Sequence, residues 1–425
     1  MIIQSAIDSI LSAVQNETKI IERRDEHLGV LLTMFSPLSF YFNNKLIKRG
    51  WAQALIIGDT RTGKTEIAEG AFRFFKQGRV ISAENCTMAG LVGGIEQIRN
   101  KRFLKWGVMP LMDKRCIALD EISGMSIEDI GQMSGIRSSG VAEINKIITA
   151  RTNARVRTLW ISNPRKNKFL HDYNTAIEAV QELIHAPEDI ARFDFAITLK
   201  EEDVPLNKIN TNYKEEKTGY TKEMGRHHLL FAWSRTADKI LLLQETEQEI
   251  FRQAILMSKI YSPEIPLIHS AEIRIKLARL AISLANLLFC INEKEDVVVH
   301  PELIEYIVKF FTTIYKKSEY DLFSERYMHS DEELDTKDLT TLIQFGKDKF
   351  IKFLEYKQIR FKDFEDVLEI DKDACKVVSG LLIRMSLIKK EYTYYRSTKQ
   401  FIELLKRWKS ELESELDNAT KDLPF

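Results

Sequence analysis

The residues best suited to chemistry lie in one short run, GDTRTGKT, at positions 58–65. Its glycines let the backbone fold around an anion, so that consecutive N–H groups and the start of the next helix face a phosphate. The pattern is that of a phosphate-binding loop, in which Lys64 reaches the β- and γ-phosphates and the Thr65 hydroxyl holds Mg²⁺. A chance glycine turn is the alternative. We expect ATP and Mg²⁺ here, with contacts from Gly58, Asp59, Thr60, Arg61, Thr62, Gly63, Lys64, Thr65 and Glu66.

Two adjacent acids, Asp120 and Glu121, follow the apolar run CIAL at 116–119. An Asp–Glu pair after a strand is usually a solvated strand end. Here the pair comes 55 residues after Thr65 of the phosphate loop, which favours a functional role. Asp120 is then expected to bind Mg²⁺ through water, and Glu121 to polarise the water that attacks ATP. Together the two motifs predict ATP hydrolysis.

These groups must be positioned by strands and helices. The segment from Trp51 to Leu199 has the sequence pattern of alternating strands and helices. Short apolar runs alternate there with helix-like segments, and the runs lack polar alternation, which is typical of a parallel sheet buried on both faces. Strand–helix alternation at this spacing predicts an α/β fold. The expected strands are 54–57, 79–82, 116–119, 159–162 and 195–198.

The composition narrows the class of protein. The chain has 425 residues, 44% of them hydrophobic and 29% charged, which is typical of a globular protein and excludes a disordered chain or a disulfide scaffold. Lys plus Arg and Asp plus Glu both number 62, so any nucleic-acid contact must come from local basic elements. The four cysteines form no CxxC pair, so we expect neither disulfides nor zinc, and a reducing compartment.

No segment has the features of a leader or a membrane span. The N-terminal stretch places Ile7, Ile10, Leu11 and Val14 on one face of a helix and has no basic leader. The longest apolar stretch, 277–291, contains polar residues and is shorter than the roughly 20 residues that a span needs. We expect no membrane contact and a cytoplasmic location.

Five short motifs in a fixed order resemble the minichromosome maintenance (MCM) branch of the AAA+ ATPases. The resemblance extends from about residue 30 to about residue 400, and the order and spacing of the motifs make it specific. The first motif replaces the family's GDPGTAKS and departs from it at Arg61 and Gly63. The motifs are GDTRTGKT (58–65), AGL (89–91), NAR followed by NP (153–155 and 163–164), ARFD (191–194), and FAWSR with a later arginine helix (231–235 and Arg274).

The resemblance implies roles for three further residues. Asn163 would be sensor 1, hydrogen-bonding the γ-phosphate or the attacking water. Arg192 would be the arginine finger that reaches the ATP of the neighbouring subunit, which is worth roughly 10³–10⁵ in rate. Arg274 would be sensor 2, which also contacts the γ-phosphate.

Each of the two arginines has a simpler alternative. Arg192 could form a surface ion pair with Asp189 or Asp194. Arg274 could form a salt bridge on its own helix, where Arg279 competes for the sensor role.

Two basic segments are candidates for contact with nucleic acid. Residues 95–110, which include Lys101 and Arg102, stand where the family inserts a hairpin into helix 2, and residues 138–152, with Lys146, where it places a second pore hairpin. In a ring both would project into the channel, and their cations would follow the phosphates. The alternative is that they are ordinary solvated loops in which Phe103 only packs.

The pattern along the chain, read together with this resemblance, divides it into five parts. Residues 345–400 have the pattern of three helices followed by a short hairpin rich in Tyr, an order that suggests a winged helix-turn-helix. We expect an N-terminal helical segment (1–45), an AAA+ α/β ATPase core (46–205), a helical lid with a polar insertion (206–330), a winged-helix domain (337–402), and a C-terminal helix and tail (403–425). About 50 residues precede the phosphate loop in this sequence, so we expect it to lack the family's N-terminal oligonucleotide-binding domain and zinc site.

The expected function is that of an ATP-hydrolysing AAA+ motor of the MCM type, a ring-forming DNA helicase or translocase. Its partners would be copies of itself in a ring homo-oligomer, a hexamer by the resemblance, single-stranded or forked DNA, and a replication or mobile-element protein. The alternative function is an AAA+ ATPase that remodels a protein partner with the same ATP chemistry.

Overall fold

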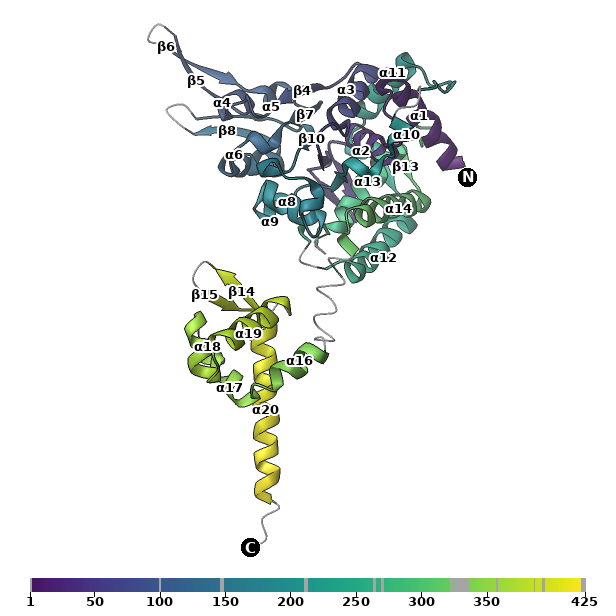
Figure 1. The fold of residues 1–425 in the computed structure, drawn as a ribbon. Helices are drawn as coiled ribbons and strands as arrows, with labels where there is room; N and C mark the ends of the chain where they lie inside the picture. The colour runs from purple at the N-terminus through teal and green to yellow at the C-terminus, as the bar shows by residue number, and fades with distance from the viewer. Residues whose placement is uncertain are drawn as a thin grey trace. The chain divides into compact units, whose positions relative to one another are not determined.

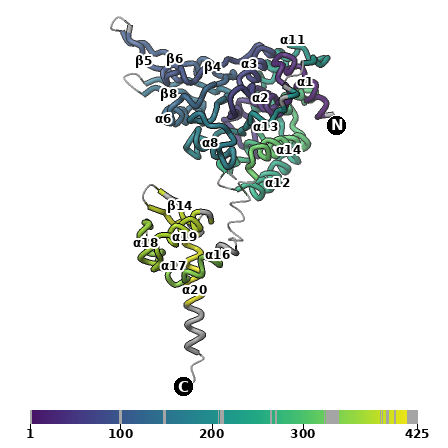
Figure 2. Tube along the Cα trace, in the orientation of Figure 1, coloured from purple at the N-terminus to yellow at the C-terminus, as the bar shows by residue number. Residues whose placement is uncertain are grey.

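A computed structural model of the chain divides into two compact units, Met1–Phe323 and Ser324–Phe425 (Figures 1 and 2). The structure describes residues 2–421 apart from 99–100, 146–148, 210–212, 263–264, 269–270, 322–323, 325–335, 357, 386 and 392–393. Each unit has its own hydrophobic core. The finer five-part division stays a prediction.

A five-stranded parallel sheet forms the centre of unit 1, and it confirms the predicted α/β fold and all five apolar runs as strands. Its spatial order is β11-β3-β10-β7-β4, and all four neighbouring pairs are parallel. All residues of β3, β10 and β11 are buried, which explains their lack of polar alternation. The strands are β3 (Gln53–Gly58), β4 (Arg79–Ser82), β7 (Cys116–Asp120), β10 (Arg157–Ser162) and β11 (Phe195–Leu199).

The N-terminal segment packs two helices against the helix that follows the phosphate loop. α1 (Ile2–Thr18) and α2 (Arg24–Met34) both contact α3 (Lys64–Phe75). The predicted apolar face of α1, with Ile7 and Leu11, is buried. The segment expected to be helical, 1–45, ends instead in a hairpin of β1 (Phe40–Phe42) and β2 (Lys45–Ile47). Asn43 and Asn44 both have positive φ angles there, as a tight hairpin turn requires.

Two further hairpins extend from one end of unit 1 (Figure 1). β5 (Gly93–Ile98) pairs with β6 (Lys101–Trp106), and β8 (Val141–Asn145) pairs with β9 (Thr149–Asn153), both antiparallel. They overlap the two segments, 95–110 and 138–152, where the family resemblance places hairpins, although β5 begins two residues earlier and β9 ends one residue later. Short helices flank them: α4 (Met88–Leu91), α5 (Val108–Leu111), α6 (Ile127–Gln132) and α7 (Ser134–Ser139).

Helices form the remainder of unit 1. α13 (Ile273–Leu287) is buried along nearly its whole length and contacts α2, α12 and α14. A two-stranded parallel pair, β12 (Ile240–Leu242) with β13 (Val297–Val299), was not expected. No helix within the described residues is long and apolar enough to cross a bilayer. The other helices are α8 (Ala176–Ile184), α9 (Pro187–Ala191), α10 (Leu206–Ile209), α11 (Lys222–Ser234), α12 (Gln244–Ile260) and α14 (Pro301–Lys317).

Unit 2 follows the predicted order of three helices and a hairpin. The hairpin is β14 (Ile388–Glu391) with β15 (Tyr394–Ser397), and its antiparallel pairing places Lys389 opposite Arg396. The winged-helix assignment of this unit stays a prediction. The helices of unit 2 are α16 (Thr336–Ile343), α17 (Lys347–Ile351), α18 (Phe361–Leu368), α19 (Lys372–Arg384) and α20 (Lys399–Lys421).

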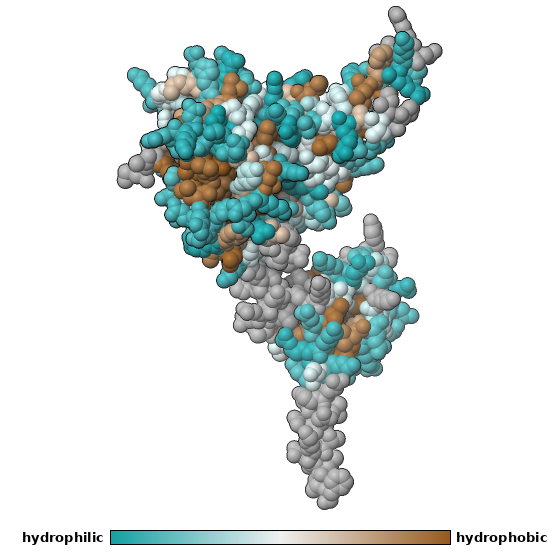
Figure 3. Space-filling view, turned by 180° about the vertical axis from the view of Figure 1, so that it is seen from behind, coloured by the Kyte–Doolittle hydropathy of each residue, from teal (hydrophilic) through white to brown (hydrophobic). Residues whose placement is uncertain are grey.

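Seen from behind, unit 1 has a patch of hydrophobic side chains in a largely hydrophilic surface (Figure 3).

Candidate functional site

The phosphate loop joins β3 to α3 at the carboxyl end of the sheet. Gly63 has φ +83°, a left-handed conformation that favours glycine, and α3 begins at the next residue. Gly58 lies against β11, where an added Cβ would come within 2.6 Å of the Leu199 carbonyl oxygen. Both glycines are therefore needed for the path of the backbone. The turn leaves the first amides of α3 open to an anion.

Lys64 is the buried cation of this loop. Its Nζ donates hydrogen bonds to the carbonyl oxygens of Gly58 (2.8 Å) and Asp59 (2.6 Å) and to Oδ1 of Asn163 (2.9 Å). Burial lowers the pKa of Lys64 to about 8. The contact with Asn163, at the end of β10, brings the expected sensor 1 residue to the phosphate-binding lysine.

Thr65 and Asp120 are positioned as a magnesium site would require. The Thr65 hydroxyl donates a 2.7 Å hydrogen bond to Oδ2 of Asp120. Mg²⁺ prefers oxygen ligands, keeps several waters, and is typically held by one or two carboxylates and the substrate's phosphates. Since no cluster of three or more His, Cys, Asp or Glu that could hold a metal occurs within the described residues, these two oxygens and the nucleotide would supply the ligands. The donor set fits Mg²⁺.

Glu121 lies at the rim of the same site and is held by a neighbouring strand. Its backbone has φ +60°, an uncommon conformation for a residue other than glycine. Its Oε2 accepts a 2.7 Å hydrogen bond from the hydroxyl of Ser82, which in turn accepts one of 3.0 Å from the Asn85 amide. Ser82 pairs with Asp120 in the β4–β7 register. Sequence analysis missed Ser82, although its place at the end of a predicted strand was the available signal.

Most of these residues share one cavity of about 370 Å³, but Gly58, Asp59 and Ser82 do not line it. The Asp59 carboxylate instead accepts hydrogen bonds from the backbone N–H groups of Leu170 (2.8 Å) and Glu201 (3.0 Å). Asp59 therefore anchors the loop through its side chain. The cavity is lined by Thr60, Arg61, Thr62, Gly63, Lys64, Thr65, Glu66, Asp120, Glu121 and Asn163.

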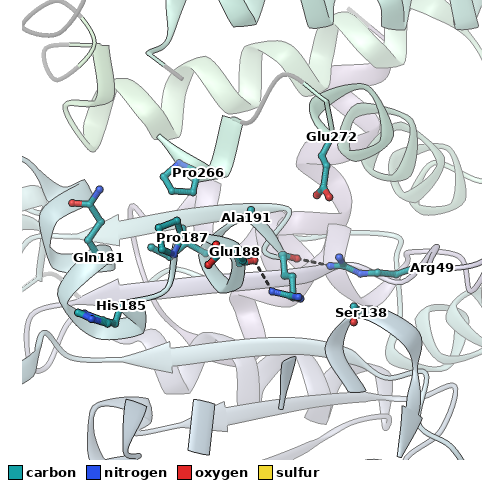
Figure 4. Close-up of a pocket in the computed structure, with 11 residues that line it drawn as sticks. Arg49, Ser138, Gln181, His185, Pro187, Glu188, Ala191, Pro266 and Glu272 are labelled. Atoms are coloured by element: carbon teal, nitrogen blue, oxygen red, sulfur yellow. Dashed lines mark hydrogen bonds between the residues drawn. The ribbon is translucent and has the colours of Figure 1, made fainter. Parts of the chain in front are cut away.

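Arg192 lines a different cavity, of about 730 Å³ (Figure 4). Its Nη1 donates to the Glu188 carbonyl oxygen (2.7 Å) and lies 3.0 Å from Oδ1 of Asp189. Of the two ion pairs weighed for Arg192, the one with Asp189 is therefore present. The cavity wall also includes Arg49 and Glu272. Because Arg192 does not line its own chain's phosphate-loop cavity, an action on nucleotide would have to reach another subunit.

The two candidates for sensor 2, Arg274 and Arg279, both lie on α13 but in different surroundings. Arg274 is exposed at its start and does not line the phosphate-loop cavity of its own chain. Arg279 is 4% exposed and contacts the fully buried Asp194 through Nη1. Arg279 therefore has a structural partner, whereas Arg274 is open to solvent.

The basic candidates on the hairpins are accessible where the structure describes them. Lys101 and Arg102 are exposed on β6, and Phe103 beside them is 48% exposed, so this ring does not pack into the core. Lys105 lies 3.3 Å from Glu96 across the hairpin. Lys146 lies outside the described residues.

Comparison with known proteins agrees with this geometry. The family model of the MCM P-loop domain matches residues 2–210. The "Minichromosome maintenance protein MCM" of Saccharolobus solfataricus is 27% identical over 169 residues, 39% of this chain and 24% of that protein. The "Probable DNA helicase MCM8" of Oryza sativa subsp. indica is 25% identical over 175 residues, 40% of this chain and 22% of that protein.

A third relative matches over a longer stretch. The "DNA replication licensing factor mcm4-B" of Xenopus laevis is 23% identical over 310 residues, 67% of this chain and 35% of that protein. The chain thus spans about a quarter to a third of the length of these relatives. With the matched P-loop domain, the five-stranded parallel sheet and the Lys64–Asn163 contact, the chain is an MCM-like AAA+ protein.

Proposed function

We propose that this chain hydrolyses ATP as a subunit of a ring-forming DNA helicase or translocase. The observation that carries the proposal is the division of the catalytic residues between two cavities. Lys64, Thr65, Asp120, Glu121 and Asn163 converge on one cavity, and the arginine finger lies in the other. Such an arrangement becomes complete only when a second copy brings its Arg192 to the nucleotide.

The residues would divide the work by charge. Thr65 and Asp120 would hold Mg²⁺, which would supply positive charge next to the nucleotide's phosphates. Lys64 exchanges its carbonyl contacts for phosphate oxygens. The Glu121 carboxylate leaves Ser82 to orient and polarise the attacking water, and the Asn163 amide fixes its position.

Two arginines would complete the site. Arg192 of the adjacent subunit neutralises the charge that develops in the transition state, which is worth roughly 10³–10⁵ in rate. Arg274, exposed on the lid, would add a second contact to the γ-phosphate.

The β5–β6 hairpin favours DNA as the substrate. Lys101 and Arg102 are exposed cations, and Phe103 offers a ring on which a base can stack, a combination typical of single-strand binding. The names of the relatives, two of which include DNA helicase or DNA replication, point the same way.

The protein-remodelling alternative also has an observation in its favour. Lys105 is paired with Glu96, and Arg151 on β9 lies 3.5 Å from Glu143, so part of the positive charge on the hairpins is neutralised. An exposed aromatic ring can also grip a polypeptide. ATP turnover with and without single-stranded DNA decides between the two substrates.

A mixing experiment tests the shared site. Arg192→Ala and Lys64→Ala chains are each expected to be inactive alone. When they are mixed, some interfaces pair an intact phosphate loop with an intact finger, so partial ATPase activity should return. Full activity of Arg192→Ala, or an active enzyme that is strictly monomeric by light scattering, contradicts the shared site.

Several finer assignments belong to this proposal. The ring is a hexamer, unit 2 is a winged-helix domain, and the substrate is single-stranded or forked DNA handled with a replication or mobile-element protein. The resemblance to the family supports these assignments, and the cytoplasmic location stays a prediction from the sequence.

A further inference from the structure

Arg137, on α7, is a buried cation that the proposed mechanism does not use. It is 1% exposed, and its guanidinium lies 4.5 Å from the ring centre of Trp160 and 4.3 Å from that of Phe193. Burial lowers the pKa of Arg137 to about 9. Removing a guanidinium from water costs free energy, which its contacts inside the protein must offset.

Two of the contacts fix the guanidinium in place. Its Nε donates to Oε1 of Gln53 (2.9 Å), and its Nη2 donates to the backbone carbonyl oxygen of Asp189 (3.0 Å). The Gln53 amide donates in return to the Arg137 carbonyl oxygen (2.8 Å). The remaining nitrogen, Nη1, makes no hydrogen bond to the described residues.

The unused nitrogen faces the carboxylate that holds the arginine finger. Arg137 Nη1 lies 3.6 Å from Oδ1 of Asp189, and Arg192 Nη1 lies 3.0 Å from the same oxygen. One buried carboxylate oxygen therefore lies between two arginines, nearer to Arg192. The next side chain on α7, Ser138, lines the cavity that holds Arg192 (Figure 4).

Movement of Arg192 away from Asp189 would leave this carboxylate without its nearest cation. If Arg192 moves to a neighbour's phosphates, Asp189, which is only 5% exposed, loses its nearest cation. A buried charge without a partner is strongly unfavourable. A guanidinium already fixed at 3.6 Å, with one nitrogen free of hydrogen bonds, can take over that oxygen after a small movement.

We propose that Arg137 is a positioning residue that takes over the Asp189 carboxylate when Arg192 extends toward the neighbouring subunit. Asp189 thus retains the finger in one state and is neutralised by Arg137 in the other. This inference rests on the proposed action of Arg192 across subunits, and it adds the device that releases the finger.

The test is the ATPase of Arg137→Met in the full-length chain. Without Arg137, Asp189 retains the finger, so kcat should fall by roughly 10–100-fold, the factor that a hydrogen bond between charged groups contributes. The KM for ATP should stay the same, because Arg137 does not line the phosphate-loop cavity. A wild-type kcat overturns the proposal.

A second substitution separates release of the finger from mere support of the fold. In Arg137→Met with Asp189→Asn, the finger is no longer held by a charge, so kcat should recover at least tenfold over Arg137→Met alone. Equal activity of the single and double variants overturns the proposal. Should Arg137→Met fail to fold by circular dichroism, Asp189→Asn alone decides, since a released finger should raise the ATPase and a tenfold fall overturns the inference.

A matched control is Arg157→Met. Arg157 is also fully buried and donates to the carbonyl oxygens of Ser36 and Lys114, away from the finger. Its replacement should lower the melting temperature and leave kcat of the folded chain unchanged. If kcat falls as much as in Arg137→Met, both losses come from damage to the fold, and the inference is overturned. If Arg192→Ala is itself fully active, the shared site fails and this inference with it. If Arg192→Ala is inactive and rescued by mixing, while the Arg137 test fails, only the positioning role is lost.

Discussion

Replacing each of two arginines on α13 by methionine should affect two different properties: stability for Arg279 and ATP hydrolysis for Arg274. Arg279→Met removes a buried partner of Asp194, whereas Arg274→Met changes a side chain that is exposed. Both substitutions keep a long unbranched side chain on the same helix. The pair therefore separates a structural cation from a candidate catalytic one.

The expected loss of stability follows from the surroundings of Asp194. This carboxylate is fully buried; its Oδ2 accepts a 2.8 Å hydrogen bond from the Gln53 N–H and lies 3.9 Å from Arg49, and its Oδ1 contacts Arg279. Removing one member of a buried ion pair costs about 3–5 kcal/mol. Since Arg49 remains, we expect about 3 kcal/mol for Arg279→Met and less than about 0.5 kcal/mol for Arg274→Met.

Urea unfolding followed by tryptophan fluorescence measures this difference. Four of the five tryptophans lie in unit 1, so the signal reports mainly that unit. With an m value of about 3 kcal/mol/M, the midpoint of Arg279→Met should fall by about 1 M. Equal midpoints for the two variants would refute the structural role of Arg279. An unchanged ATPase in Arg274→Met would refute the sensor 2 assignment.

Four other substitutions test the site and its surroundings. Glu121→Gln should keep ATP binding and assembly but stall hydrolysis, because only water activation is lost; an ATP affinity as poor as that of Lys64→Ala would contradict this division of labour. Ser82→Ala should raise the basal ATPase in the absence of DNA by a fewfold, since Glu121 is then no longer held. Phe103→Ala should lower single-strand affinity by about 1–3 kcal/mol, as measured by fluorescence anisotropy, whereas Tyr41→Ala, equally exposed on β1, should not. Burial lowers the pKa of Lys276 from 10.5 to about 7. Between these two pH values the unfolded chain binds more protons than the folded chain, so the free energy of unfolding should rise with pH. The urea midpoint should therefore rise less from pH 7 to about pH 9 in Lys276→Met than in the unsubstituted chain.

Features that depend on local sequence were predictable. The phosphate loop is specified by glycines at positions that need them, and the buried strands by continuous apolar runs, so both were found without knowledge of tertiary contacts. The hairpin at 40–47 was missed because its first strand, FYF, is too short and apolar to be told from the end of a helix. The Asn43–Asn44 turn was the available signal.

Contacts between distant segments were not predictable in the same way. Ser82 meets Glu121 only through the pairing of β4 with β7, and Arg137 meets Asp189 across 52 residues of chain. The choice between Arg274 and Arg279 also required the structure, which shows that Arg274 is exposed at the start of α13 whereas Arg279 is buried and paired. Periodicity gives the face of a helix but not the residue that covers it.

The surroundings of the buried Asp194 carboxylate also connect α13 to Arg192. Arg279 of α13 contacts Asp194 and donates to the Arg49 carbonyl oxygen (2.8 Å), and Arg49 in turn donates to the carbonyl oxygen of Arg192. Packed interiors shift between discrete arrangements rather than deform smoothly. A shift of α13 would therefore be passed through Arg49 to the backbone of Arg192, whose guanidinium is in contact with Asp189. Both the backbone and the guanidinium of Arg192, the proposed finger, are thus held by residues of its own chain, and the backbone contact leads through Arg49 to α13.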